Sequence, residues 1–150
     1  MPFFEDLLRA SLVACIKQNV FVVEYRHISG CLFGDDKEAV DFITELRIIR
    51  SIVDELKKTT PHFEVRLILS GLKILGASHV EMILNHVKVG SECKDKNIAE
   101  LVAGFDLVNE EDFTPEISTF AETILDYQDK VTVVDEPGQK MPTFFHAGET

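Results

Sequence analysis

The segment EAVDFITELRIIRSIVDELKKTTPHFEVRLILS (38–70) decides the fold, because it places a long amphipathic helix directly before a short apolar strand. The helix over 38–58 is predicted from apolar side chains that recur at intervals of three and four, namely Ala39, Phe42, Ile43, Leu46, Ile49, Val53 and Leu56. Pro61 ends it, since the residue before a proline disfavours the helical conformation. Residues 63–70 form an apolar run too short for a helix, which predicts a strand.

The same alternation extends to both sides of this segment. Before it, residues 3–18 predict a helix with an apolar stripe, and VFVVEY (20–25) predicts a strand that is buried on both faces. After it, residues 78–89 predict a helix with Ser78 as N-cap and Glu81 at the capping-box position. Strand and helix therefore follow one another in regular order.

The last part of the chain continues the pattern. A strand is predicted over 101–108, and a helix over 114–130 with Thr114 as N-cap and Pro115 at its first position. A fourth strand is predicted over 142–147. We expect evenly spaced strand ends, near Arg26, Arg66, Asp106 and His146.

This rhythm is typical of βαβ units and predicts an α/β fold with about four parallel strands and alternating helices. No helix is predicted after the last strand, so one face of such a sheet would be poorly covered. A (β/α)8 TIM barrel takes roughly 250 residues. We therefore expect residues 1–150 to be a single partial barrel domain that lacks the first and last barrel strands.

Composition excludes several classes of function. Lys and Arg number 15 against 26 Asp and Glu, which gives a net charge of −11 and argues against a nucleic-acid partner. No apolar run approaches the roughly 20 residues that span a bilayer, so no membrane association is expected. Residues 1–18 do not resemble a secretory signal, because Glu5 and Asp6 stand where a basic region should be.

The segment MPTFFHAGET (141–150) carries the most informative chemistry. An apolar strand ends in His146, and Gly148 and Glu149 follow. Because the carboxyl ends of parallel strands form the functional face of such folds, His146 is a candidate metal ligand there. Glu149 lies close enough along the chain to act as a general acid or base in the same site. The alternative is a core histidine followed by an ordinary turn.

The other polar candidates have simpler interpretations. His27 is expected to be a polar loop residue, with lining of the site as the alternative. His79 and His86 are expected to form an exposed pair on one helix face, with a metal site as the alternative. Glu24 and Arg26 alternate with apolar residues, so they are either a structural ion pair or substrate contacts.

F-H-A-G-E-T (145–150) resembles the signature of the adenosine deaminase family of metal-dependent barrel hydrolases. AGFDLVNEED (103–112) resembles the family's G-x-D-L-x-G-x-E segment, and FVVEYR (21–26) is similar to its E-x-R strand. FEVRLILS (63–70) fits the strand between them. FFHAGET together with AGFDLV is most similar to the secreted branch, the adenosine deaminase-related growth factors. The resemblance runs from about residue 3 to residue 150.

The resemblance implies a Zn²⁺-dependent hydrolase that converts adenosine or 2'-deoxyadenosine to inosine and ammonia. His146 matches a zinc ligand, and Glu149 matches the residue that protonates the purine ring. Asp106 matches a family aspartate and is assigned to holding the strand end in place, and it is also a candidate substrate-binding residue. Asn109 stands where the family has a glycine whose backbone contacts the purine, so it is a candidate substrate-binding residue and puts the preferred nucleoside in doubt.

The family's H-x-H pair and its S-D-D strand end are not found in this chain. A catalytic zinc needs about three protein ligands, so the resemblance implies an incomplete catalytic domain that is inactive alone. The alternatives are a catalytically inactive, growth-factor-like binding or signalling module, or another metal-dependent hydrolase on the same barrel. The resemblance also implies an extracellular, secreted protein, with a cytoplasmic one as the alternative, and a possible homodimer at full length.

Overall fold

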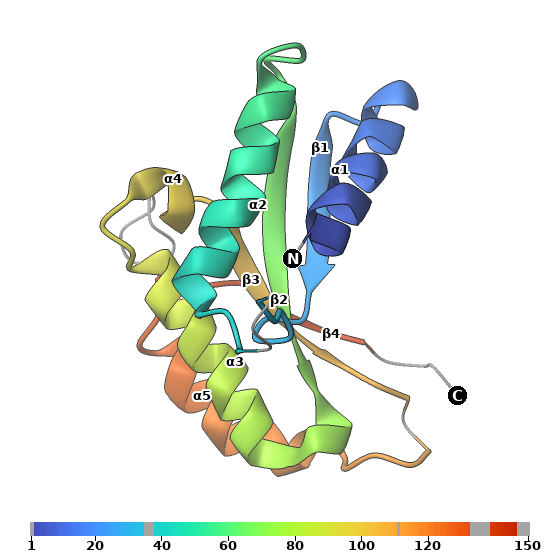
Figure 1. Cartoon of the computed structure of the whole chain (residues 1–150). Helices are drawn as coiled ribbons and strands as arrows, with labels where there is room; N and C mark the ends of the chain where they lie inside the picture. The colour runs from blue at the N-terminus through green and yellow to red at the C-terminus, as the bar shows by residue number, and fades with distance from the viewer. Residues whose placement is uncertain (1, 35–37, 111, 133–138, 147–150) are drawn as a thin grey trace.

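A computed structural model describes residues 2–34, 38–110, 112–132 and 139–146. Four strands in these residues form one parallel sheet in the order β1-β2-β3-β4 (Figure 1): β1 Val22–His27, β2 Glu64–Leu72, β3 Val102–Val108 and β4 Thr143–Phe145. The main helices are α1 Pro2–Lys17, α2 Phe42–Lys57, α3 Gly76–Ser91 and α5 Ala121–Gln128. The predicted α/β alternation with four parallel strands is confirmed.

One face of the sheet packs on the helices. Figure 1 places α2, α3 and α5 together on one side of the strands, with α1 beside β1. The core between these layers takes alternate strand residues, namely Val65, Leu67 and Leu69 of β2 and Phe105 and Leu107 of β3. Because side chains alternate along a strand, the residues between them point to the opposite face. We call this opposite face the open face; it carries Arg26, Ile68, Ser70, Gly104, Asp106, Phe144 and His146.

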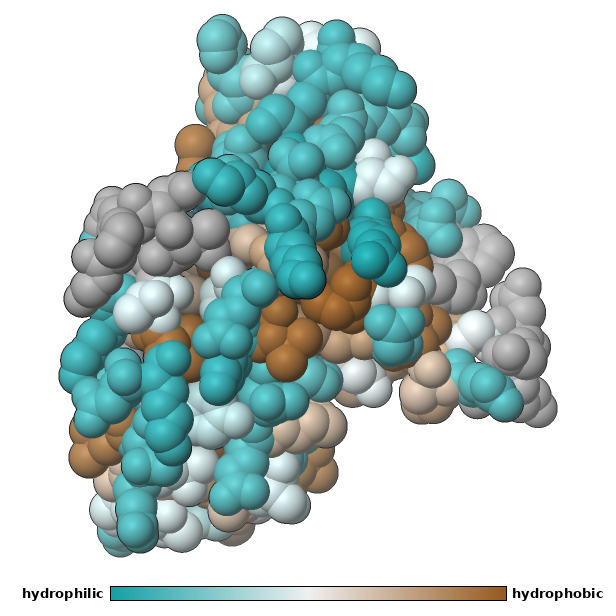
Figure 2. All heavy atoms as spheres, turned by 90° about the vertical axis from the view of Figure 1, so that its left-hand side faces the viewer, coloured by the Kyte–Doolittle hydropathy of each residue, from teal (hydrophilic) through white to brown (hydrophobic). Residues whose placement is uncertain are grey.

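The helix-covered side is largely hydrophilic on its outside, with hydrophobic patches in the centre of the view (Figure 2). This pattern follows from amphipathic helices that turn their apolar stripes inward. In α2 the buried residues are Phe42, Glu45, Leu46, Ile49, Ile52 and Val53. Among the described helices, none is both long and apolar enough to cross a membrane.

The first half of the chain departs from prediction at two places. β1 is the outermost strand of the described sheet and is not buried on both faces, because Val22, on the same face as Arg26, is 67% exposed. α2 begins at Phe42 rather than near residue 38, because the Asp41 side chain accepts a hydrogen bond from the Thr44 amide and caps the helix. A hydrogen bond from the Thr44 side chain lowers the pKa of the Asp41 carboxyl, and the bond from the Thr44 amide lowers it further.

Both later helices start differently from prediction. Ser78 is not an N-cap: a short 3-10 turn, η1 (Lys73–Leu75), leads straight into α3, which starts at Gly76. The predicted helix over 114–130 is shorter, with a 3-10 turn η2 (Ile117–Phe120) before α5. Thr114 does not cap it, since its hydroxyl donates to the Glu110 carbonyl.

The strand ends are also less regular than expected. β2 extends to Leu72, so Arg66 lies within the strand and pairs in register with Glu24 of β1. A register shift between Leu67 and Ile68 brings Ser70 opposite Asp106. A short helix, α4 (Lys96–Ala99), was not predicted. The even spacing of predicted strand ends was therefore wrong for β2.

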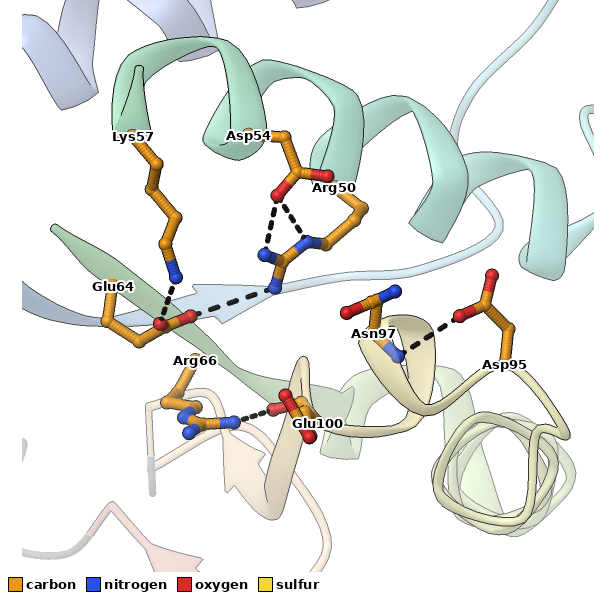
Figure 3. A network of polar contacts seen from close by, with 8 residues as sticks. All are labelled: Arg50, Asp54, Lys57, Glu64, Arg66, Asp95, Asn97 and Glu100. Atoms are coloured by element: carbon orange, nitrogen blue, oxygen red, sulfur yellow. Dashed lines mark hydrogen bonds and ion pairs between the residues drawn. The ribbon is translucent and has the colours of Figure 1, made fainter. Parts of the chain in front are cut away.

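The amino-terminal end of β2 is fixed by ion pairs (Figure 3). Arg50 of α2 contacts Asp54 at 2.5 Å and Glu64 at 3.7 Å, and Lys57 contacts Glu64 at 2.6 Å. The Arg66 guanidinium donates to the Glu100 carbonyl, which ties β2 to the end of α4. These contacts lie at the end of β2 opposite to Ser70, which faces Asp106.

Candidate active site

The candidate site lies where β3 and β4 end on the open face. Asp106 is in β3, and it pairs in register with Phe144 of β4. His146 follows β4 directly, and its backbone amide donates to the Leu107 carbonyl at 3.3 Å, which continues the ladder. Two polar residues from neighbouring strands are thus brought to one point of the sheet.

Asp106 is the centre of this group. Its side chain is 0% exposed, and it accepts a hydrogen bond of 3.0 Å from Nε of Arg26. Nδ1 of His146 lies 2.9 Å from Oδ2 and 3.1 Å from Oδ1 of the same carboxylate. The buried carboxylate therefore has two partners, as a buried charge requires.

This contact determines which ring nitrogen of His146 is free. A carboxylate accepts a proton from Nδ1–H, so the neutral ring keeps its lone pair on Nε2. The His146 side chain is 33% exposed, so the outer part of the ring is accessible. A histidine whose other nitrogen is held by a carboxylate is the usual arrangement for a metal ligand.

Among the described site residues, His146 can supply one ligand to a metal ion. In the described part of the chain, no group of three or more His, Cys, Asp or Glu residues could hold a metal ion. Asp106 is engaged by Arg26 and His146, so it suits the role of orienting a ligand. His146 therefore fits one position of a metal site, and the described residues do not supply a complete ligand set.

Of the other two predicted site residues, the structure describes Asn109 but not Glu149. Asn109 directly follows β3 and has φ of +121°, a region that favours glycine, while its Oδ1 accepts from the Ile74 amide at 3.5 Å. It is half-buried beside the carboxyl end of β3. Glu149 lies outside the described residues.

Two histidine predictions were wrong. His27 is not in a polar loop: it ends β1, is 7% exposed, and its Nε2 lies 2.5 Å from Oε1 of Glu45. The other oxygen of Glu45 accepts from the Gly30 amide at 3.0 Å. Sequence reasoning missed Glu45, although it sits three residues after Phe42 on the apolar stripe of the helix.

The helix pair His79 and His86 is not an exposed surface pair, since both side chains are half-buried. His86 stacks on Phe42 with ring centroids 4.4 Å apart, and its Nδ1 lies 2.8 Å from the Ser29 hydroxyl. Burial lowers the pKa of His86, and the nearby Glu45 opposes this shift. Burial also lowers the pKa of His79. These contacts anchor the loop after β1 to α2 and α3.

The sequence of the chain is similar to curated adenosine deaminases. It is 27% identical to adenosine deaminase 2 of Pongo abelii and of Homo sapiens over 153 aligned positions, and 25% identical to adenosine deaminase 2-A of Danio rerio over 150. Each alignment covers 99% of this chain. The chain spans only 27% to 28% of the length of these relatives. No family model matches it.

The fold is shared with a solved structure. The Arabidopsis protein ADAL, solved in complex with IMP, superposes with a TM-score of 0.62 at 16% identity. The match covers 97% of this chain and 39% of that protein. The expected resemblance to adenosine deaminases is thus confirmed, and so is the expected α/β fold of parallel strands with alternating helices.

Proposed function

We propose that this chain is part of the catalytic domain of a zinc-dependent deaminase. The reaction is the hydrolysis of adenosine or 2'-deoxyadenosine to inosine and ammonia. The observation that carries the proposal is the contact between Asp106 and His146 at the ends of β3 and β4. The similarity to adenosine deaminase 2 along 99% of the chain supports it.

In this proposal His146 would hold the metal through Nε2, and Asp106 would keep the ring oriented. The remaining ligands come from outside the described residues, in the parts of a longer protein that form the rest of the barrel. The chemistry that zinc would supply there is a hydroxide nucleophile at neutral pH, because zinc lowers the pKa of water to about 7. The chain's own contribution is to present His146 in one tautomer and one direction.

Glu149 is proposed as the general acid that delivers a proton to the purine ring. It stands three residues after His146 in the sequence. Asn109 is proposed to line the nucleoside pocket beside Asp106, because it directly follows β3. An extracellular location and a homodimer of the full-length protein belong to the same proposal.

The deciding experiment uses the full-length protein that contains this chain. Purified wild type is expected to hold zinc and to convert adenosine to inosine, and His146→Ala is expected to lose metal and activity together. His62→Ala is the matched control, because His62 is exposed in the turn before β2. A folded wild type that binds zinc without deaminating adenosine would point to a signalling module or to another metal-dependent hydrolase.

A further inference from the structure

Arg26 reaches across the sheet to a residue of a strand that is not its neighbour. β1 pairs with β2, and β2 pairs with β3, yet Nε of Arg26 in β1 donates to Oδ2 of Asp106 in β3 at 3.0 Å. In register, Arg26 pairs with Ile68, and Ile68 pairs with Gly104. The side chain therefore spans β2 and leans two residues toward the carboxyl end of β3.

Phe144 and Gly104 support the Arg26 side chain in this position. Its guanidinium carbon lies 6.0 Å from the centroid of the Phe144 ring, within the range of a cation–π contact. Phe144 in turn fills the space above Gly104: a Cβ at position 104 would lie 2.8 Å from Cε2 of Phe144 and 2.9 Å from the Pro142 carbonyl oxygen. The absence of a side chain at Gly104 thus leaves room for the Phe144 ring, over which the Arg26 guanidinium lies.

The carboxylate of Asp106 is fully buried, and among its described partners the Arg26 guanidinium is the one that is always charged. Removal of one partner from a buried charge leaves that charge uncompensated, and the carboxylate then turns or takes up another partner. Either change would alter the acceptor that Nδ1 of His146 uses. The orientation of His146 therefore depends on Arg26 through Asp106, which both side chains contact.

We propose that Arg26 is a positioning residue that acts through Asp106 to orient His146 toward the metal. This inference rests on the proposed function, because it takes His146 as a metal ligand. Gly104 and Phe144 support this role, since Gly104 leaves room for the Phe144 ring and that ring contacts the guanidinium. Arg26 itself is not a catalytic residue here.

The test measures metal affinity in the full-length protein by competition with a chelator, together with the absorption spectrum of the cobalt-substituted form. Arg26→Gln is expected to weaken metal binding about tenfold and to shift the cobalt spectrum. Tenfold is the lower end of the loss in metal affinity that follows when a residue supporting a metal ligand is replaced. Arg26→Lys keeps the charge and is expected to recover part of the affinity. Arg50→Gln is the control, because Arg50 of α2 also pairs with carboxylates, and its partner Glu64 lies at the amino-terminal end of β2, away from Asp106.

A double-mutant cycle with Asp106→Asn separates a relay from general stabilisation. If Arg26 acts through Asp106, Arg26→Gln adds less than about twofold in the Asp106→Asn background. An equal loss in both backgrounds, or an unchanged affinity and cobalt spectrum in Arg26→Gln, overturns the inference. If Asp106→Asn does not fold, the comparison of Arg26→Gln with Arg26→Lys decides. A wild type that binds no metal refutes the proposed function instead.

Discussion

His146 and Asp106 form one unit, with Nδ1 of the imidazole 2.9 Å from a carboxylate oxygen that is fully buried. The two residues lie 40 positions apart in the chain and meet because β3 and β4 are neighbours. An ionised carboxylate can only accept hydrogen bonds, so the imidazole carries its proton on Nδ1 and leaves Nε2 unprotonated. The geometry makes Asp106 as important to the site as the residue that it orients.

Asp106→Asn is expected to weaken metal binding about 10- to 100-fold with little change in side-chain volume. An amide is neutral and has one acceptor oxygen beside an NH2 donor, so the charge opposite Arg26 is lost and the bond to Nδ1 of His146 becomes weaker. Metal content and chelator competition on the full-length protein check this. Asp126→Asn is the control, because its carboxylate is exposed and pairs only with Lys130 among the described contacts. Equal metal affinity in the two variants would contradict the prediction.

Glu149→Gln is expected to lower kcat for adenosine about 100- to 10,000-fold, since general acids contribute in that range. The metal is expected to stay bound, and KM to change less than kcat, because the proton is delivered in the transition state. Steady-state kinetics beside metal analysis separates the two roles. Loss of metal comparable to that of His146→Ala would make Glu149 a ligand rather than an acid.

Acid is expected to destabilise the protein through His86. Burial lowers the pKa of His86 in the folded state, while the unfolded chain titrates near its ordinary value of about 6.5. The unfolded state therefore takes up the proton first, and the free energy of unfolding falls as pH drops below about 6.5. Urea unfolding at pH 7.5 and 5.5 is expected to show a smaller decrease for His86→Gln than for wild type. Identical decreases would exclude His86 as the source.

Gly90→Ala in α3 is expected to destabilise the protein despite the better helix propensity of alanine. A Cβ at position 90 would lie 2.7 Å from Cγ2 of Val102 and 3.3 Å from Cε1 of Phe42. Overpacking costs about 1–3 kcal/mol, which exceeds the propensity gain of about 1 kcal/mol. Ser78→Ala is the control on the same helix, because Ser78 is exposed and is not a cap. Thermal melting measures both, and a more stable Gly90→Ala would show that the neighbouring side chains yield.

Asn109→Gly is expected to stabilise the protein by about 1 kcal/mol. The φ of +121° at Asn109 belongs to a region that costs a residue with a Cβ about 1–3 kcal/mol, which outweighs the entropy cost of glycine of about 0.5–1 kcal/mol. The hydrogen bond to the Ile74 amide is long, at 3.5 Å, and adds little. Urea unfolding tests the stability, and KM for adenosine is expected to fall if Asn109 lines the pocket. A loss of stability would mean that the contact with Ile74 dominates.

By itself, the sequence determined the order of helices and strands, the α/β class and the placing of Asp106 and His146 near strand ends. These features depend on local periodicity and on the rule that parallel strands share a functional end. Only the tertiary structure decided that Arg26 pairs with Asp106, 80 positions away, rather than with Glu24. The buried pair of His27 and Glu45 was likewise hidden. Such contacts depend on strand order and register, which long-range packing sets and which no local pattern of residues encodes.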